Sequence, residues 1–270
     1  MNSSPAVREL RALPTPDDVG PLPRSFGRYV LFDHIGRGGM ADIFLARAKN
    51  NLGASRLLVV KQILPKFSGD EGFARLLREE AKLAADLNHA NIVHVVDLGY
   101  EDGRLFIAME YVEGFYLNRL LGALTKQGIP LPAEFAFFLI CQVLRALDYA
   151  HRACDAHGRP LAIVHRDVSP SNVLISLEGE VKLCDFGIAR ALGRTDDSAF
   201  EESRVQKARL VGKSGYMAPE HARSEQIDSR SDVFAAAILL WELAAGRRMY
   251  RGSEAEILRQ ARHGEVPPLP

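Results

Sequence analysis

The sequence predicts an α+β fold, in which a small β-rich lobe with one helix precedes a larger helical lobe. Two patterns predict it. Short β-type runs follow one another between residues 29 and 110, with a single helical stretch among them, whereas after Gly114 the apolar residues recur at helical spacing. With 270 residues, 47% of them apolar, the chain is long enough to bury a core in each lobe.

Each predicted element rests on such a run. The strands are expected at residues 29–34, 43–49, 56–63, 93–98 and 105–110, and the helices at 73–87, 133–151 and 231–246. Residues 1–27 hold five of the 14 prolines and show little apolar periodicity, which predicts a disordered tail. The two lobes are therefore expected at 28–112 and 113–270.

Composition excludes several classes of function. Lysine plus arginine equals aspartate plus glutamate at 34 each, so no excess positive charge favours nucleic acid or an anionic membrane. The three cysteines are too few for a disulfide framework or a zinc cluster, and no signal peptide is visible. The most apolar run, 233–243, is interrupted by Glu242 and is far shorter than the ~20 residues that span a bilayer. These features predict a cytoplasmic protein without membrane contact in this chain.

A glycine-rich segment lies between the first two predicted strands, so its glycines are expected in a hairpin. Because a dinucleotide-binding fingerprint needs a helix at this point, that alternative is disfavoured. Glycine lets backbone N–H groups approach phosphate oxygens closely, which makes the hairpin a candidate phosphate site, although a plain glycine hairpin is the competing interpretation. The segment consists of Ile35, Gly36, Arg37, Gly38, Gly39, Met40, Ala41, Asp42 and Ile43.

A lysine and a glutamate form the next candidate pair. Lys61 interrupts the apolar strand 56–63, and Glu80 falls within the apolar stripe of the predicted helix 73–87. A carboxylate on an inward face is unfavourable unless a cation meets it, and Lys61 is the candidate cation. The alternative is that Glu80 reaches solvent at the edge of the stripe.

Segment 165–187 contains several candidate catalytic and metal-binding residues close together in the sequence. Two alternating runs joined at Glu178–Gly179 predict a β-hairpin with a two-residue turn, and counting outward from that turn places Asn172 opposite Asp185. An amide oxygen and a carboxylate at the open end of a hairpin suit Mg²⁺, which takes few protein oxygens when it shares phosphates. Asp167 is then placed to accept the proton of an attacking hydroxyl. The alternative is a coincidental loop with the same side chains.

Together these residues resemble the eukaryotic-like, Hanks-type protein kinase family, and the run Gly-Arg-Gly-Gly-Met resembles its bacterial serine/threonine branch. The resemblance covers residues 28–266. The matching positions, in the family's order and spacing, are Gly36, Gly38, Ala41 and Ile43, then Lys61, Glu80, His165–Arg166–Asp167, Asn172, Asp185–Phe186–Gly187 and Ala218–Pro219–Glu220.

The resemblance implies a bilobal kinase fold and a set of roles. Residues 35–43 would cover the phosphates of ATP, Lys61 would bind the α- and β-phosphates and pair with Glu80, and Asp167 would be the base. Asn172 and Asp185 would hold Mg²⁺. The resemblance also implies that Asp232 braces the 165–167 loop. The adenine site would be formed by Ile43, Val59, the gatekeeper Met109, the hinge from Glu110 to Val112, and Leu174.

The chain departs from the family pattern at several positions. Ala41 replaces the third glycine of the hairpin, and Ser169 stands where serine/threonine kinases have a lysine that touches the γ-phosphate. Lys213 stands where they have a threonine, so the cation is expected to have moved across the cleft. Residues 205–209 contain no Ser, Thr or Tyr, so activation is expected not to need phosphorylation there.

The resemblance also implies a C-terminally incomplete larger lobe, because residues 267–270 precede the family's last helices and the arginine that pairs with Glu220. The predicted function is ATP-dependent transfer of phosphate to serine or threonine hydroxyls of a protein substrate, including autophosphorylation. A pseudokinase or nucleotide-binding scaffold and a small-molecule phosphotransferase are the alternatives. The long segment between Gly187 and Glu220 favours a protein substrate over the last of these.

Overall fold

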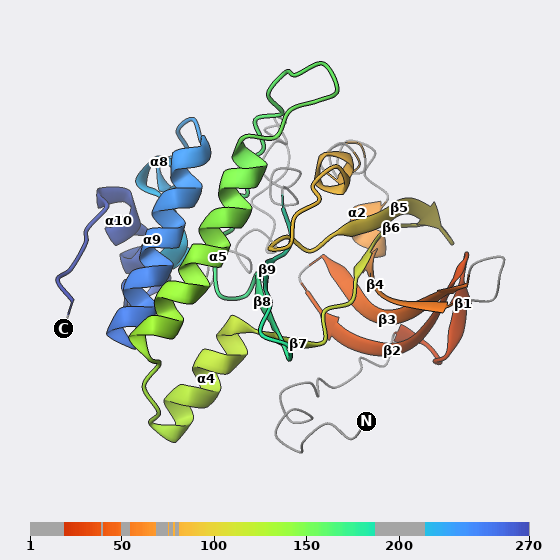
Figure 1. Cartoon of the computed structure of the whole chain (residues 1–270), viewed down its shortest axis with the longest axis horizontal. Helices are drawn as coiled ribbons and strands as arrows, with labels where there is room; N and C mark the ends of the chain where they lie inside the picture. Colours follow the sequence, from red (N-terminus) through yellow and green to blue (C-terminus); the bar gives the residue numbers. More distant parts are fainter. Residues whose placement is uncertain are drawn as a thin grey trace. The chain divides into compact units, whose positions relative to one another are not determined.

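The computed structural model of the chain divides into two compact units (Figure 1). The first comprises the chain up to Asp86 together with His94–Glu113, and the second comprises Leu87–Val93 and the chain from Gly114 onward. The structure describes residues 19–38, 40–49, 55–68, 75, 78, 81–186 and 214–269. The first unit is β-rich and the second mainly helical, so the predicted α+β fold is confirmed.

The first unit is built on a six-stranded antiparallel sheet of order β1-β2-β3-β4-β6-β5. A short helix, α2 (Pro65–Ser68), follows the fourth strand. The strands are β1 (Arg24–Phe26), β2 (Tyr29–Arg37), β3 (Ala41–Lys49), β4 (Ser55–Ile63), β5 (Val95–Glu101) and β6 (Arg104–Glu110). The five strands expected between residues 29 and 110 are all present, and each is longer than predicted.

This sheet curls strongly, because side chains of strands far apart in its order meet. The ring of Phe26 on β1 lies edge-on to that of Phe106 on β6, with centroids 5.3 Å apart. Phe26 is fully buried with Tyr29 and Leu31 in one apolar core. The prediction of a disordered tail reaching residue 27 is therefore wrong at 24–26, where burial of Phe26 outweighs the neighbouring prolines.

The register of the strands separates the two faces of the sheet. Asp42 lies opposite Gln62 and Phe44 opposite Val60, so these residues share the face that holds the core. The other face carries Ile43 opposite Lys61.

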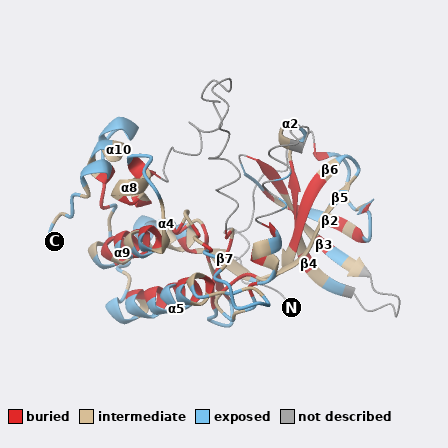
Figure 2. Cartoon of the chain, turned by 90° about the horizontal axis from the view of Figure 1, so that it is seen from above, coloured by how far each residue is buried: buried red, intermediate tan, exposed pale blue. Residues whose placement is uncertain are grey.

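The second unit combines a small antiparallel sheet with a group of helices. The sheet has the order β7-β8-β9, and α5 packs along α9 (Figures 1 and 2). The elements are β7 (Gly114–Tyr116), α4 (Leu117–Gln127), α5 (Ala133–His151), β8 (Val173–Ser176), β9 (Val181–Leu183), the 3-10 turn η2 (Ser214–Tyr216), α8 (Pro219–Ala222), α9 (Ser229–Ala245) and α10 (Glu254–His263).

The long helices begin and end close to their predicted bounds. The first spans the predicted 133–151, while α9 begins two residues before the predicted Ser231 because Asp228 caps it, accepting a hydrogen bond from the backbone N–H of Arg230 at 2.8 Å. Gly246, in the left-handed conformation, ends it. Within the described ranges, no helix has the length and apolarity needed to cross a bilayer.

Segment 87–93 belongs to the second unit although it interrupts the first in sequence. It bonds to β9 through its backbone: Leu183 N–H donates to the Asn91 carbonyl at 2.8 Å, and Val93 N–H donates to the Leu183 carbonyl at 2.9 Å. His89 stacks on Tyr149 of α5, with ring centroids 4.9 Å apart. This segment is therefore attached to the second unit by an isolated parallel β-bridge, Ile92–Leu183, and by ring stacking.

The predicted helix 73–87 is helical at Arg75, Arg78 and residues 81–85. Ala81, Ala84 and Leu87 are buried, as an inward apolar stripe requires. Glu80, the predicted partner of Lys61, lies outside the described residues.

Candidate functional site

A buried carboxylate holds the loop that contains the predicted base. Asp232, at the start of α9, is only 1% exposed and accepts hydrogen bonds from the backbone N–H groups of His165 (2.8 Å) and Arg166 (2.7 Å). His151 of α5 contacts the same carboxylate through Nε2 at 2.8 Å. The prediction that Asp232 braces this loop is confirmed, and His151 is a further partner that the sequence did not reveal.

The His165 ring connects both ends of the site. Its Nδ1 accepts from the backbone N–H of Asp167 at 3.2 Å, so Nε2 carries the proton and donates to the carbonyl of Cys184 at 2.9 Å. The ring also lies edge-on to Phe186, with centroids 4.5 Å apart. One fully buried imidazole thus fixes the start of the loop and the residues flanking Asp185.

Two residues of this region adopt the left-handed backbone conformation without being glycine. Arg166 has a φ of 66° and Asp185 a φ of 65°. Such a conformation is unfavourable for a residue with a Cβ and persists only where the surroundings impose it. The bonds from Asp232 and His165 supply that restraint, and strain of this kind is concentrated at functional sites.

Asn172 ties the loop to the β8–β9 hairpin. Its side-chain amide donates to the Asp167 carbonyl at 2.7 Å, and its own backbone carbonyl accepts from the N–H of Cys184 at 2.9 Å. Asp167, Asn172 and the residue before Asp185 are thereby connected in one network. The structure brings three of the predicted site residues together within the second unit.

The predicted register of the hairpin is wrong by one residue. Val173 pairs with Leu183 and Ile175 with Val181, so Asn172 lies opposite Cys184 rather than Asp185. The turn contains three residues instead of two, because Gly179 takes a left-handed conformation, with φ of 86°.

The Ser176 hydroxyl accepts from the Glu180 N–H at 2.9 Å and stabilises this longer turn. Asp185 still lies near Asn172, since it directly follows the paired Cys184.

The donor set of Asn172 and Asp185 suits Mg²⁺. Because the amide nitrogen of Asn172 is used by the Asp167 carbonyl, the amide oxygen remains as an acceptor, and a carboxylate is the second hard ligand. Where side chains are described, no three His, Cys, Asp or Glu groups form a cluster that would enclose a metal. Two protein oxygens fit an ion that also binds phosphates, rather than a structural metal site.

Ser169 is buried, at 2% exposed. Its hydroxyl lies 2.9 Å from that of Ser171, and its carbonyl accepts from the Asn172 N–H at 2.9 Å. The residue therefore has a structural position within the loop. Lys213, Gly187 and residues 205–209 lie outside the described residues.

In the first unit, the glycine-rich hairpin forms as predicted between β2 and β3. Gly38 N–H donates to the Ala41 carbonyl at 2.8 Å and closes the turn. The side chains of Met40, Ala41 and Asp42 are buried, which leaves the backbone and not these side chains to face a ligand. Gly39 lies outside the described residues.

The predicted nucleotide contacts of the first unit share one face of the sheet. Ile43 pairs with Lys61, and Val59 pairs with Met109, so all four alternate away from the core. Lys61 is only 7% exposed.

The remaining predicted contacts are divided between the units. In the first, the backbone N–H of Glu110 donates to the His94 carbonyl at 2.9 Å, and Val112 follows β6. In the second, Leu174 pairs with Tyr116 across β7 and β8. Burial raises the pKa of the Tyr116 hydroxyl, and nearby Cys184 and Asp185 raise it further.

The sequence missed a second buried carboxylate network. Glu242, the residue that interrupts the apolar run of α9, accepts from the Tyr216 hydroxyl at 2.5 Å, from Arg248 at 3.1 Å and from the Met249 N–H at 2.9 Å. Burial raises the pKa of Tyr216, and the Glu242 charge raises it further. The signal was the charge inside an apolar helix, but the sequence did not indicate its partners.

Two residues of α8 lie near the ends of other elements of this region, Glu220 beside Ser231 of α9 and His221 beside the 165–167 loop. Glu220 accepts from the Ser231 hydroxyl, so among the described residues it has a partner without the arginine expected from the family. Burial lowers the pKa of His221, and the neighbouring Arg166 lowers it further, against the opposing effect of Asp167. The loop is thus flanked by an imidazole that favours its neutral form.

Comparison with known proteins agrees with this geometry. The protein kinase domain model matches residues 29–266. The chain is 38% identical over 254 residues to the tyrosine-protein kinase MasK of Myxococcus xanthus, and 36% identical over 232 residues to the serine/threonine-protein kinase PrkC of Bacillus subtilis. These alignments cover 92% and 86% of this chain but only 38% and 32% of those proteins.

Among solved structures, the Mycobacterium tuberculosis PknI kinase domain is similar, with a TM-score of 0.64 and 28% identity. The similarity covers 87% of this chain and 81% of that one. The glycine hairpin, the Asp232-braced loop and the Asn172–Cys184 pairing thus occur in a chain that matches one family model over nearly its entire length, and the chain belongs to the protein kinase family.

Proposed function

We propose that this chain transfers the γ-phosphate of ATP to serine or threonine hydroxyls of a protein substrate, and also phosphorylates itself. The observation that carries the proposal is the network in which Asp232 and His165 hold the loop of Asp167 while Asn172 connects it to Asp185. The loop geometry suits catalysis by positioning and electrostatics, on which phosphoryl transfer depends.

Each residue has a role in this proposal. Asp167 accepts the proton of the attacking hydroxyl, and Asn172 and Asp185 hold Mg²⁺, which when bound offsets the negative charge of the phosphates. Lys61 binds the α- and β-phosphates and is held by Glu80. The adenine contacts are Ile43, Val59, Met109, Glu110, Val112 and Leu174, and residues 35–43 cover the phosphates.

Lys213 is proposed to supply the positive charge that Ser169 lacks. Because the negative charge of the transferred phosphoryl group is spread over its oxygens, a nearby ammonium stabilises the transition state. Lys213→Thr is expected to lower kcat about 10²-fold, the effect of losing one positioned donor. If kcat stays within about threefold, equivalent to well under 1 kcal/mol, the idea is wrong.

Two observations bear on competing functions. The relative MasK is named a tyrosine-protein kinase, whereas PrkC is named a serine/threonine-protein kinase, so tyrosine is the second candidate acceptor. A pseudokinase is the remaining alternative, and the presence of Lys61, Asp167, Asn172 and Asp185 argues against it.

A cytoplasmic location is part of the proposal, supported by three cysteines that form no disulfide.

The experiment is phosphoamino-acid analysis after incubation with labelled ATP, Mg²⁺ and a generic protein substrate. Phosphoserine or phosphothreonine, absent in Asp167→Asn, is the expected result. If only phosphotyrosine were found, the acceptor would be tyrosine and not serine or threonine. If the label did not exceed that of the Asp167→Asn control, the pseudokinase would be favoured. Replacing Mg²⁺ by a chelator should abolish transfer in every active preparation.

A further inference from the structure

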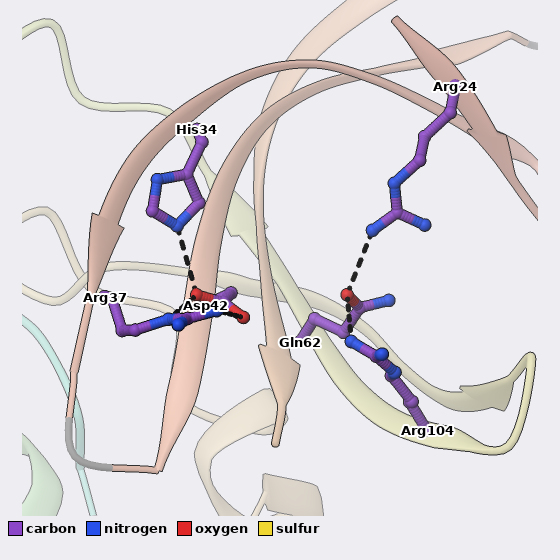
Figure 3. Close-up of polar contacts among 6 residues, drawn as sticks. All are labelled: Arg24, His34, Arg37, Asp42, Gln62 and Arg104. Atoms are coloured by element: carbon purple, nitrogen blue, oxygen red, sulfur yellow. Dashed lines mark hydrogen bonds and ion pairs between the residues drawn. The ribbon is translucent and has the colours of Figure 1, made fainter. Parts of the chain in front are cut away.

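The tip of the glycine-rich hairpin is locked by side chains as well as by its backbone. Arg37 and Asp42 are the last pair in the β2–β3 register, one step before the Gly38–Ala41 hydrogen bond that closes the turn. Arg37 stands between Gly36 and Gly38, so whatever holds its side chain also restrains the flanking glycine backbone. Figure 3 shows the guanidinium of Arg37 beside the Asp42 carboxylate.

Asp42 is bound from two sides. Arg37 contacts it in bidentate fashion, with Nε donating to Oδ1 at 2.5 Å and Nη2 donating to Oδ2 at 2.9 Å. His34 Nε2 lies 3.1 Å from Oδ1 (Figure 3). The Asp42 side chain is 3% exposed and that of Arg37 is 30% exposed, so the carboxylate is the buried anchor and the arginine the covering group. Because a guanidinium is a planar fork, two parallel bonds fix its orientation.

His34 fixes the orientation of the Asp42 carboxylate. Its ring lies edge-on to Phe44, with centroids 5.2 Å apart, and is itself buried. Within the described part of the chain, Nδ1 has no hydrogen-bond partner, which is less unfavourable for a lone pair than for an N–H, so the proton belongs on Nε2 facing Asp42. The carboxylate is thus held at the start of β3 and offers both oxygens to Arg37.

We infer that Asp42 is a positioning residue for the phosphates of the nucleotide. By holding Arg37, it keeps the Gly36–Gly38 backbone, whose turn is closed by the Gly38–Ala41 hydrogen bond, near the conformation in which the hairpin covers the phosphates. Glycine backbone loses the most conformational freedom on ordering, so a hairpin that is ordered before binding retains more of its affinity. The inference rests on the proposed ATP-dependent function and gives the Asp42 side chain, which does not itself bind the nucleotide, a role within segment 35–43.

The test compares ligands with and without phosphates. Dissociation constants are measured by calorimetry for the non-hydrolysable analogue AMP-PNP with Mg²⁺ and for adenosine. Asp42→Asn keeps the shape of the side chain but removes its charge. It is expected to weaken AMP-PNP binding about tenfold, the effect of re-ordering about one residue, while changing adenosine binding less than about twofold.

A matched control comes from the same sheet. Asp97 of β5 accepts from the Tyr29 hydroxyl at 2.5 Å and pairs with Arg28 at 2.7 Å, and it contacts β2 at Tyr29, the end remote from Arg37. Asp97→Asn therefore removes another arginine–aspartate pair of this sheet, a more exposed one, without touching the hairpin tip. It should lower the melting temperature but leave both dissociation constants unchanged.

Two further measurements make the outcome decisive. Arg37→Gln, a change at a partly exposed residue, should weaken AMP-PNP as much as Asp42→Asn does, and the double variant should be no weaker than either, because both break the same link. Hydrogen exchange of amides 37–42 without nucleotide should accelerate in Asp42→Asn but not in Asp97→Asn.

The two proposals fail in different ways. Unchanged or tighter AMP-PNP binding by Asp42→Asn, an equal loss for adenosine, or multiplicative effects of the two substitutions would overturn the positioning role alone. A wild-type chain that binds no AMP-PNP would instead overturn the proposed function and this inference with it.

Discussion

Asp42 in the first unit and Asp232 in the second are both almost fully buried carboxylates, but the described residues that donate to them differ in kind. The donors to Asp42 are side chains, those of Arg37 and His34. Asp232 receives two of its bonds from backbone N–H groups, of His165 and Arg166, and a third from the side chain of His151.

This difference decides what each carboxylate controls. A bond to backbone N–H fixes the path of the chain itself, and Asp232 restrains Arg166 at a positive φ that it would otherwise leave. A bond to side chains leaves the backbone its ordinary hydrogen bonds, so loss of Asp42 loosens the hairpin without rerouting it. Asp232 should therefore matter for the fold and the reaction together, and Asp42 mainly for the ligand.

The largest expected effect is that of Asp232→Asn. The amide presents only one acceptor oxygen where two backbone donors converge on two oxygens, so one buried N–H is left facing an NH₂ group. Breaking a buried charged network of this kind costs about 3–5 kcal/mol. Urea unfolding should show this loss, and kcat should fall at least about 10²-fold because Asp167 loses its position.

Asp228 provides the control for that experiment. It caps the same helix from an exposed position, and asparagine caps a helix about as well as aspartate. Asp228→Asn should leave activity and the urea midpoint nearly unchanged. If Asp232→Asn behaved the same way, the backbone bonds would not be what holds the loop.

Glu242→Gln should have an intermediate effect, since among the described donors this carboxylate has one backbone N–H, where Asp232 has two and Asp42 has none. It binds the side chains of Tyr216 and Arg248 and the backbone N–H of Met249. Loss of its charge should cost about 1.5–3 kcal/mol in unfolding free energy, and Tyr216→Phe about 1 kcal/mol. A loss above that of Asp232→Asn would show that the donor type does not set the ranking.

The smallest expected effect is a pH dependence at His221, beside the Asp232-braced loop. Its folded pKa lies below the unfolded value of 6.5, chiefly through burial and then through Arg166, while Asp167, Glu220 and Asp232 oppose the shift. Below pH 6.5 the unfolded state therefore binds more protons than the folded state. Folding is therefore not opposed by protonation of His221 above pH 6.5, and the free energy of unfolding decreases as the pH falls from there toward the folded pKa.

The measurement is urea unfolding of the wild type and His221→Gln between about pH 5 and about pH 7.5. The wild type should lose more stability on acidification than the variant, and the difference between the two isolates this residue from the other seven histidines. Parallel pH profiles would exclude the effect.

Two kinds of feature could be predicted from the sequence: elements marked by a periodic pattern of apolar residues, and residues that match a position of the family. The strands, the long helices and the Asp232 brace all follow from periodicity or resemblance. The β8–β9 register could not be predicted, because a two-residue and a three-residue turn fit the same glycine, and only the left-handed Gly179 decides between them. One residue of slip changes every pair.

The polar networks were hidden for a different reason. Arg37 and Asp42 look like solvent-exposed residues of a glycine loop, whereas in the structure the Asp42 side chain is 3% exposed and the Arg37 side chain, paired with it, is 30% exposed. Gln62, on the same face, similarly receives Arg24 and Arg104 at 3.2 Å each (Figure 3). For Glu242, the partners Tyr216 and Arg248 come from segments before and after its helix, which no local pattern connects.

Because of segment 87–93, a single cut in the chain cannot separate the two units cleanly. A cut after Glu113 would leave this segment attached to the N-terminal fragment, although its hydrogen-bonding partners on β9 and the Tyr149 ring belong to the C-terminal one. Each fragment would carry one side of the Ile92–Leu183 bridge, which only the other completes. The two fragments are therefore expected to reassociate when mixed. The segment that contains His89, Asn91 and Val93 would bind back to its partners in the C-terminal fragment.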